Sequence, residues 1–572
     1  MMRRFVLNIA LCAALLLPTS VSWAQNVPSP SQVAPPAIPP GPGIRGRIAI
    51  PQVPAGAAIP EQARKLTFRL TGLDIQGEFD ELVAARRELS APLIGRRITV
   101  AQLFEFADKL QQIYVRAGYP LARVVILPHE FEGSAHIKLR VIDGFIEEMN
   151  LDGIPSPARR RINKVLEPLI GKTHLRQSEL ERQLLLAGET PGVILNATFA
   201  AGKQVGGSVL VLTGRYRPVS ASLYIDNAMP RVFGTGQAVV TGSLNSVLGY
   251  GEQLTLSAAG LPDKDFTTRY PTRRYLSASL GLPLGVDGWR LDLSGTDGKT
   301  TPRVTQNVAT QGLLSQAQAK LSYDVVKSRD FVLTAGVAFT ATDEKINSLL
   351  FDPAIALSLD RTRVLRPSID GLWRLRATGT TVGFGIGYSR GLPGLGARRA
   401  ADADPLLPLS RAGADAVFSK LDGRFEITQA IPYDFTVSLG AFGQTSFNVP
   451  MLTSQQFDIT GARMLSGFTA GALAGDTSWA VRGELARPFA AFNAVITPYL
   501  FAATGERIYE NPSILEVGSL HAQNYGLGAR FLLAPWAAWA PDGYGFVEWS
   551  RARTTDGILN GDRIFTGLIL RY

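Results

Sequence analysis

From about residue 217 onward, apolar and polar residues alternate in short stretches that turn residues separate. In an extended chain, Leu254 and Leu256 point to one side while their polar neighbours point to the other. Similar stretches occur at 275–282, 290–294, 332–339 and 435–442. No apolar run here reaches the ~18 residues of a membrane helix. One apolar and one polar face fit a wall between lipid and a wet lumen, so the pattern predicts a transmembrane antiparallel β-barrel over residues 217–572.

A soluble β-sandwich would show similar alternation, but this region is too long for one sandwich. The last predicted strand, Arg563–Tyr572, carries Leu568, Leu570 and Tyr572 at alternate positions. Only a closed barrel leaves no unpaired backbone edge in lipid. An aromatic residue that ends an alternating last strand is the usual mark of bacterial outer-membrane barrels. We therefore interpret these three residues as a signal for the cell's barrel-assembly machinery.

Residues 63–143 show a different pattern, in which strand and helix periods are mixed. A strand is predicted over 66–75, and Thr99 with Gln102 forms a capping box that starts a helix. Two further strands are predicted near 124–127 and 136–141. The order is strand, helix, helix, strand, strand, which indicates a small α+β module.

A similar order recurs in residues 144–216. Ser156 is expected to cap the first of two helices. The predicted elements are a strand at 146–151, helices at 157–169 and 177–186, and strands at 193–199 and 208–213. Two tandem α+β modules of similar pattern thus precede the barrel.

The start of the chain reads as a secretory signal peptide over residues 1–24, with Arg3 and Arg4 before a short apolar run. Residues 25–62 are rich in proline and predict an extended or disordered linker. The chain has one cysteine, Cys12, which lies in the signal peptide. The mature chain therefore has neither a disulfide nor a cysteine metal site.

Formal net charge is +10, but the longest basic run is the triplet Arg159–Arg161. Dispersed surface and lumen charge explains this balance better than nucleic-acid binding, which is not expected. The four histidines do not occur in a metal-binding spacing, so neither a metal nor another cofactor is predicted. The sequence GYSRG at 387–391 matches a hydrolase nucleophile motif around Ser389, but no helix pattern follows it. No enzyme activity is predicted.

Several local stretches, in this order and spacing, resemble a known family. They are AGYPLARVVILP (117–128), IKLRVIDG (137–144), TPGV (190–193), YIDN (224–227), LGYGEQLTLS (248–257), LGLPLGVDGWRLDLS (280–294), SRGLPGLGAR (389–398) and QQFDITGA (455–462). Together they resemble the two-partner secretion transporters, the TpsB or ShlB/FhaC/HecB-type haemolysin secretion/activation family of the POTRA and outer-membrane β-barrel superfamily. The resemblance covers roughly residues 66–572.

This resemblance implies a membrane all-β fold: a C-terminal sixteen-stranded antiparallel transmembrane barrel, preceded by two periplasmic α+β POTRA domains. It implies a monomer in the outer-membrane lipid that exports an unfolded, haemolysin- or adhesin-like partner polypeptide without ATP. The POTRA domains would capture this partner, for which free sheet edges are suited. A factor that inserts other outer-membrane proteins belongs to the same superfamily and stays open as the alternative.

The family carries a Val-Arg-Gly-Phe/Tyr motif in a long loop inside the barrel, and its Arg pairs with the Asp of a wall motif Phe-x-Asp-x-Gly. The matching loop residues here are Leu465, Ser466, Gly467 and Phe468, followed by Gly475 and Asp476. The matching wall residues are Phe501, Ala503 and Gly505. Both charged partners are therefore replaced. Losing both members of a buried pair is near neutral, whereas losing one costs about 3–5 kcal/mol.

Many family members also place a helix before the first POTRA domain, and this helix plugs the pore. The corresponding segment here is too rich in proline for such a helix. The sequence therefore predicts no helical plug.

Overall fold

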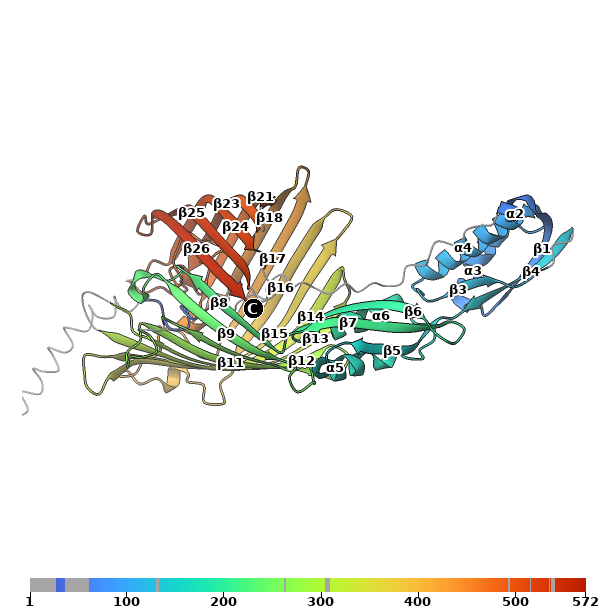
Figure 1. Ribbon diagram of the computed structural model, residues 1–572. Coiled ribbons are helices and arrows are strands. Elements are labelled where there is room, and N and C mark those ends of the chain that lie inside the picture. Colours follow the sequence, from blue (N-terminus) through green and yellow to red (C-terminus); the bar gives the residue numbers. More distant parts are fainter. Residues whose placement is uncertain are drawn as a thin grey trace, which may run out of the picture.

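The computed structural model describes residues 27–35, 61–129, 133–261, 264–303, 309–491, 494–514, 516–533, 535 and 541–572. The predicted signal peptide and most of the predicted linker lie outside these residues. In the described parts, two α+β modules are followed by a closed β-barrel (Figure 1). None of the helices described has both the length and the apolarity needed to cross a bilayer.

The first module is a sheet of strand order β2-β1-β4-β3 packed against helices. Its helix α4 begins at the predicted capping box: the Thr99 hydroxyl accepts the Gln102 N–H at 3.1 Å, and the Gln102 side chain accepts the Thr99 N–H at 2.8 Å. The elements are α2 (Glu61–Lys65), β1 (Thr67–Gln76), η1 (Asp80–Leu82), α3 (Val83–Ser90), β2 (Arg97–Thr99), α4 (Val100–Arg116), β3 (Arg123–Ile126) and β4 (Ser134–Ile142).

The second module has the strand order β5-β7-β6 and two helices. The prediction that Ser156 caps the first helix was wrong. Ser156 is itself the first helical residue, and the capping position is Pro155, whose extended backbone (ψ 139°) starts the helix without a side-chain hydrogen bond. The elements are β5 (Phe145–Gly153), α5 (Ser156–Leu166), η2 (Glu167–Leu169), α6 (Gln177–Gly188), β6 (Val193–Ala201) and β7 (Gly207–Tyr216).

Aromatic stacking and hydrogen bonds join the two modules. The rings of Phe79 and His174 stack with their centroids 4.2 Å apart, and His174 Nδ1 lies 2.8 Å from the Asp143 carboxylate. Arg176 of the second module donates to the Tyr119 hydroxyl at 3.4 Å. Within the first module Tyr119 donates to Glu81, and this hydrogen bond, together with burial, raises the pKa of the Tyr119 hydroxyl. These contacts hold the first module to the second at a defined joint.

The barrel has sixteen wall strands, as the family resemblance implies. One of them is interrupted at Arg487 and Pro488, so that β21 and β22 both pair with β23. The strands are β8 (Val219–Asp226), β9 (Gln237–Asn245), β10 (Gln253–Ala259), β11 (Arg273–Leu284), β12 (Trp289–Thr300), β13 (Thr310–Lys327), β14 (Phe331–Ser348), β15 (Ile355–Leu375), β16 (Thr380–Gly391), β17 (Ser419–Ile431), β18 (Phe435–Thr445), β21 (Thr477–Ala486), β22 (Phe489–Ala491), β23 (Ala494–Ile508), β24 (Ser519–Leu533), β25 (Asp542–Thr554) and β26 (Gly561–Arg571).

The alternation seen in the sequence sorts the side chains onto the two faces of this wall. Leu254 and Leu256 are exposed on the outer face, where lipid lies. On the inner face, the hydroxyl of Thr255 lies 2.9 Å from that of Ser243 on the neighbouring strand. The barrel predicted from the alternating pattern is confirmed.

Pairing between β26 and β8 closes the barrel. The two strands pair in register from Gly567 opposite Asp226 to Arg571 opposite Ser222. Tyr572 extends this seam, because its N–H donates to the Ala221 carbonyl at 2.9 Å. Leu568 and Tyr572 are exposed on the outer face. Their role as an assembly signal stays a prediction.

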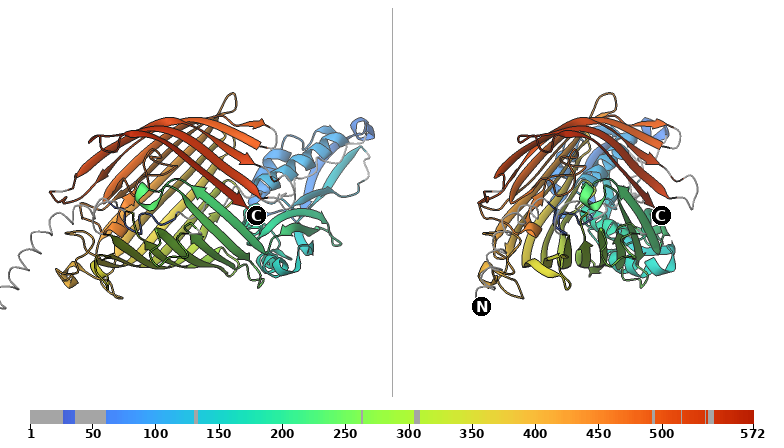
Figure 2. Two further views of the ribbon diagram at one scale, coloured as in Figure 1. Left: turned by 60° about the vertical axis from the view of Figure 1, so that its left-hand side comes forward. Right: turned by 90° about the vertical axis from the view of Figure 1, so that its left-hand side faces the viewer.

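The second module sits against the turns at one end of the barrel. Arg161 of α5 donates to the Gly285 carbonyl at 2.6 Å, and Arg182 of α6 donates to the Asp287 and Asp324 carbonyls, each at 2.6 Å. The modules are therefore strung out from one rim of the barrel (Figures 1 and 2). Since they are periplasmic, the opposite rim faces the cell exterior.

Candidate functional site in the barrel lumen

The segment between β18 and β21, residues 446–476, leaves the outer rim and folds back inside the barrel. It contains the short helix η5 (Thr453–Gln455) and the paired strands β19 (Phe457–Asp458) and β20 (Ala474–Gly475). We call this segment the lumenal loop. It contains the motif Leu465–Phe468 that the sequence singled out.

Apolar side chains attach the loop to one side of the wall. Leu465 and Leu473 are fully buried, and Phe468 is nearly so. Burying such a side chain contributes about 1.5–3 kcal/mol. The cluster consists of Ile459, Leu465, Phe468 and Leu473 from the loop, and Ala480, Ala503, Leu520, Ala522 and Ala552 from the wall.

Ser466 lies at the centre of a buried polar network on the same side. Its hydroxyl donates to the carboxylate of Glu548 on β25. It accepts hydrogen bonds from Arg482 of β21 at 2.8 Å and from Asn524 of β24 at 3.2 Å. Ser466 is fully buried, so these bonds form out of contact with water.

The network contains an ion pair whose two members both belong to the wall. The Arg482 guanidinium lies 2.7 Å from the Glu548 carboxylate and 2.9 Å from that of Glu484. It also stacks over the ring of Phe501, 3.7 Å from the centroid. Arg482 is the direct cross-strand partner of Ala503, the position that carries Asp in the family motif. A cation therefore remains at this place in the lumen, but it comes from the wall instead of the loop.

The loop contributes only uncharged groups to this attachment. Besides the Ser466 hydroxyl, the carbonyls of Ser466 and Phe468 accept hydrogen bonds from Arg563 of β26. Because both charges stay on the wall, the loop motif around Ser466 can separate from it without leaving an unpaired buried ion at this site, which costs about 3–5 kcal/mol. Elsewhere the loop forms ion pairs of its own: the exposed Arg463 pairs with Glu426 of β17, and Asp476 pairs with Arg411 at the outer rim.

Two glycines of the sequence motifs allow the loop to approach the wall closely. A Cβ atom at Gly467 would lie 3.0 Å from the Cβ atoms of both Asn524 and Ala552. A Cβ atom at Gly505 would lie 2.4 Å from the Trp479 carbonyl oxygen and 3.0 Å from the Leu465 side chain. The loop motif and the wall motif thus face each other.

Asp476 holds the end of the loop at the outer rim. Its fully buried carboxylate pairs with Arg411 from the segment between β16 and β17. It also accepts the backbone N–H groups of Met451 at 3.1 Å and of Glu510 at 2.8 Å. The neighbouring Gly475 pairs with Phe457. Asp476 therefore links the loop to two neighbouring outer segments.

Residues 27–35 also lie inside the barrel, near the outer rim (Figure 2). Val33 is fully buried against Met229 and Phe233, and its carbonyl accepts from Arg273 at 2.7 Å. The Tyr275 hydroxyl donates to the Pro30 carbonyl. These nine residues form a turn and contain no helix; the rest of the predicted linker up to Pro60 lies outside the described residues. The sequence did not anticipate that part of the proline-rich segment packs in the lumen.

In the part of the lumen opposite the loop, strands β9–β14 carry uncharged polar pairs between the ion pair of Arg290 with Asp292 at the periplasmic end and Glu344 near the outer rim. The hydroxyls of Ser277 and Thr296 lie 3.0 Å apart. Gln318 donates to Thr340 at 3.0 Å, and Gln316 donates to Thr342 at 3.1 Å. We call this surface the neutral wall. Residues 27–35 cover its outer end.

The hydrolase motif does not form a nucleophile elbow. Ser389 lies within strand β16 and is 1% exposed, so it is not on a strand-to-helix turn. No group of three or more metal-ligating side chains occurs among the described residues.

Sequence reasoning located the loop and wall motifs but missed Arg482, Glu548, Asn524 and Arg563. Each lies on a wall strand and points inward, where a wet lumen makes a polar residue ordinary. The pairing of Arg482 with Ala503 would have been a signal, but it becomes visible only once the register of β21 and β23 is known.

Two family models match the chain. One is described as "Haemolysin secretion/activation protein ShlB/FhaC/HecB" and matches residues 206–515. The other is described as "POTRA domain, ShlB-type" and matches residues 68–144. The first match covers the end of the second module and the barrel up to residue 515. The second match covers the first module.

Similar proteins include the heme/hemopexin transporter protein HuxB of Haemophilus influenzae, which is 22% identical over 76% of this chain and 75% of its own length. The outer membrane transporter CdiB of Escherichia coli is 26% identical over 38% of this chain and 36% of its own length. The solved structure of CdiB from Escherichia coli covers 100% of this chain and 98% of its own, with a TM-score of 0.68 and 17% identity. This structural likeness shows the fold.

We expect Ser466→Ala to destabilise the attachment of the loop by about 1–3 kcal/mol, because Arg482 and Glu548 each lose a buried hydrogen-bond partner. Denaturant unfolding of the detergent-solubilised barrel measures this change. The matched control is Ser446→Ala in the same loop, whose equally buried hydroxyl has, among the described residues, a single hydrogen-bond partner, the Thr477 hydroxyl at 3.3 Å. Equal stability losses in the two variants would contradict the role given to the network.

We expect deletion of residues 28–35 to raise the ionic conductance of the purified protein severalfold, because the outer end of the neutral wall becomes uncovered. Planar lipid bilayers give the readout. A deletion of residues 44–51, which shortens the same proline-rich segment equally, should leave the conductance unchanged. Unchanged conductance in both variants would show that residues 27–35 do not obstruct the pore.

Proposed function

The chain belongs to the haemolysin secretion/activation family ShlB/FhaC/HecB, whose members are outer-membrane two-partner secretion transporters, and from this we propose that it exports an unfolded exoprotein through its own lumen. The exoprotein is a large haemolysin- or adhesin-like partner that the POTRA modules capture in the periplasm. The observation that supports this best is a closed barrel in which the loop motif around Ser466 is attached by contacts that can be broken without separating the wall's own ion pair.

The neutral wall is the path we assign to the passing chain. An extended polypeptide exposes backbone N–H and C=O groups, and hydroxyl and amide side chains can exchange hydrogen bonds with them. Arg290 and Asp292 of β12 form an ion pair at the periplasmic end of the neutral wall, and on other strands Arg366 pairs with Asp422 and Arg424 with Asp370. Charges that are satisfied by each other do not bind charged cargo residues tightly.

Movement of the lumenal loop and of residues 27–35 would open this path. The Ser466 hydroxyl bonds to the ion pair of Arg482 with Glu548, which persists on the wall after the loop has left. The carbonyls of Ser466 and Phe468 accept from Arg563, which also belongs to the wall. The apolar cluster around Leu465 would be exposed at the same time, which opposes opening. The closed state is therefore the resting state, and a cargo segment in the lumen must displace it.

Capture in the periplasm would use the edge of the second module. In the part of the chain that the structure describes, strand β6 pairs with β7 on one side only, so its other side can accept an extended chain as an added strand. Main-chain hydrogen bonds recognise an unfolded segment without demanding a particular side chain. The periplasm supplies no ATP, and folding of the exported chain outside would prevent its return.

The alternative, insertion of other proteins into the membrane, requires the wall to part so that strands can leave sideways into lipid. The seam between β26 and β8 is where this would occur. Leu570 and Leu223 are paired across it, and the chain's one cysteine, Cys12, lies in the predicted signal peptide. A disulfide between Leu570→Cys and Leu223→Cys would lock the barrel shut without narrowing the lumen.

We expect the locked barrel to secrete its partner at the unlocked rate, because the cargo passes along the lumen. Immunoblots of the culture medium, with and without reductant, measure secretion. The control pair Leu280→Cys and Leu293→Cys crosslinks β11 to β12 away from the seam. Loss of secretion in the seam variant alone, restored by reductant, would favour lateral release and overturn the proposal.

Phe199→Pro tests capture at the free edge of β6. Gly202 donates to Gly207 across the hairpin, so the N–H groups of odd-numbered residues on β6 point away from β7. Proline removes one such donor, and we expect binding of the unfolded partner to weaken about fivefold, as the loss of one hydrogen bond predicts. Phe199→Ala loses the same side chain but keeps the N–H and is the matched control. Equal weakening in both variants, measured by calorimetric titration, would exclude strand addition at this edge.

A further inference from the structure

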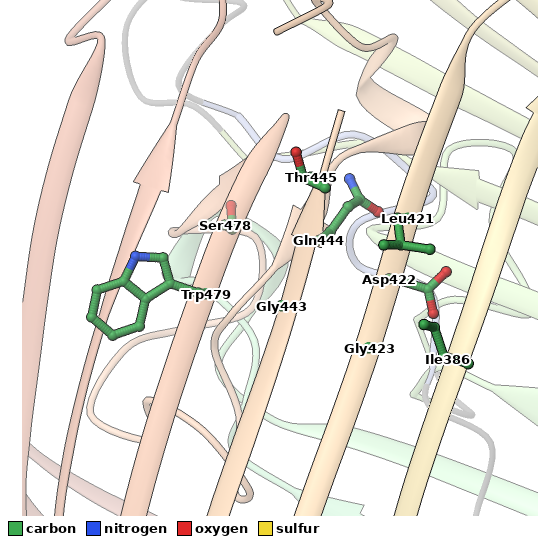
Figure 3. Close-up of a pocket in the computed structure, with 9 residues that line it drawn as sticks. All are labelled: Ile386, Leu421, Asp422, Gly423, Gly443, Gln444, Thr445, Ser478 and Trp479. Atoms are coloured by element: carbon green, nitrogen blue, oxygen red, sulfur yellow. The ribbon is translucent and has the colours of Figure 1, made fainter. Parts of the chain in front are cut away.

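A groove of about 250 Å³ lies on the lipid-facing side of the barrel wall. Four consecutive wall strands, β16, β17, β18 and β21, contribute to it (Figure 3). Ile386 and Trp479, both exposed, form its two edges, and Leu421 adds a third apolar side chain. The groove therefore opens away from the lumen and is separate from the secretion path.

Two glycines create the hollow. Gly423 of β17 and Gly443 of β18 are direct cross-strand partners, so no side chain fills the wall between the flanking apolar residues. Elsewhere on the outer face, large residues such as Leu254, Ile369 and Leu527 project into lipid. A hollow in a surface surrounded by hydrocarbon loses dispersion contacts unless an acyl chain or another side chain enters it.

The register places the groove in the outer half of the membrane. Leu421 is paired with Thr445, and Thr445 is the last residue of β18 before the lumenal loop. Trp479 stands two residues after Thr477, the first residue of β21. Tryptophan favours the boundary between hydrocarbon and headgroups. The groove thus lies against the leaflet that faces the cell exterior.

A cationic and hydroxyl-rich patch lies on the rim side of the groove. Arg390 and Tyr388 follow Ile386 at alternate positions of β16, so all three point outward. Arg390 donates to the Ser419 hydroxyl at 2.7 Å, and Tyr388 donates to the same hydroxyl at 2.9 Å. Among the residues that the structure describes, no carboxylate lies within ion-pair distance of Arg390.

We propose that the groove binds an acyl chain of a phosphorylated outer-leaflet glycolipid, with the phosphate at Arg390. Arg390 lies four positions after Ile386, about 13 Å along β16. This spacing suits a lipid whose headgroup lies at the rim while one chain follows the wall inward. An arginine without an acidic partner matches the phosphate charge, and the Ser419 hydroxyl, which accepts from Tyr388 and Arg390, keeps its own proton to donate.

The site would brace the part of the wall from which the lumenal loop leaves. Strand β18 carries Gly443 in the groove and continues directly into the loop. Lipid binding at this groove does not depend on whether the barrel secretes a partner protein.

Gly423→Leu fills the groove and is the decisive variant. A Cβ atom at Gly423 would come no closer than 3.8 Å to a neighbouring atom, so the wall can accept the side chain. The matched control is Gly483→Leu on β21, where nothing lies within 4 Å of the added Cβ atom. Arg390→Gln removes the charge and leaves the groove open.

Native mass spectrometry of the full-length protein in detergent, titrated with bisphosphorylated lipid A, counts the bound lipid. We expect saturable binding of one lipid A, about tenfold weaker in Gly423→Leu and unchanged in Gly483→Leu. Arg390→Gln should weaken lipid A but not a dephosphorylated lipid A. Equal binding by the wild type and Gly423→Leu would overturn the proposal, as would binding of phosphatidylglycerol in preference to lipid A. A dimer of the wild type that Gly423→Leu dissociates would instead assign the groove to a second copy of the chain.

Discussion

Hydrocarbon offers no hydrogen-bond partner to a peptide backbone, and the arrangement of the second half of this chain follows from that constraint. Sixteen strands pair with one another until β26 meets β8, which leaves no free edge in lipid. Closure then fixes the rest: one face of every strand meets lipid and the other encloses a polar lumen. A loop or terminal segment that enters this lumen needs hydrogen-bond partners for its polar groups and apolar contacts for its hydrophobic side chains. The wall provides both to the lumenal loop.

The lumenal loop shows how such a segment is held without being fixed permanently. The ion pair of Arg482 and Glu548 belongs to the wall, and Ser466 only adds hydrogen bonds to it. In the family motif one charge of the pair comes from the loop itself. Moving that charge to the neighbouring strand keeps the electrostatic site but lowers the cost of separation, because neither ion is left alone when the loop departs. The attachment of the loop motif then depends mainly on the apolar cluster around Leu465 and Phe468, while Asp476 holds the end of the loop at the outer rim.

Much of this fold could be predicted from the sequence because the relevant signals are local. The alternation around Leu254 and Leu256 gives the lipid face, and the capping box at Thr99 gives the start of α4. The replacement of the Arg and Asp of the family motifs was also visible, at Ser466 and Ala503. The compensating cation was not, because Arg482 becomes a partner of Ser466 only through strand register and a loop fold that join distant residues. For the same reason, a proline-rich stretch predicts the absence of a helix but not the burial of Val33 inside the barrel.

The central claim is that an unfolded partner travels along the neutral wall inside the barrel. A photocrosslinking amino acid at Thr296, which faces the lumen beside Ser277, tests it directly during secretion of a stalled partner. The same label at Leu293, three residues earlier and exposed to lipid, is the matched position on the other face of β12. The account predicts that the partner crosslinks to position 296 and not to position 293. Crosslinking at 293 alone, or at neither position while secretion continues, would contradict it.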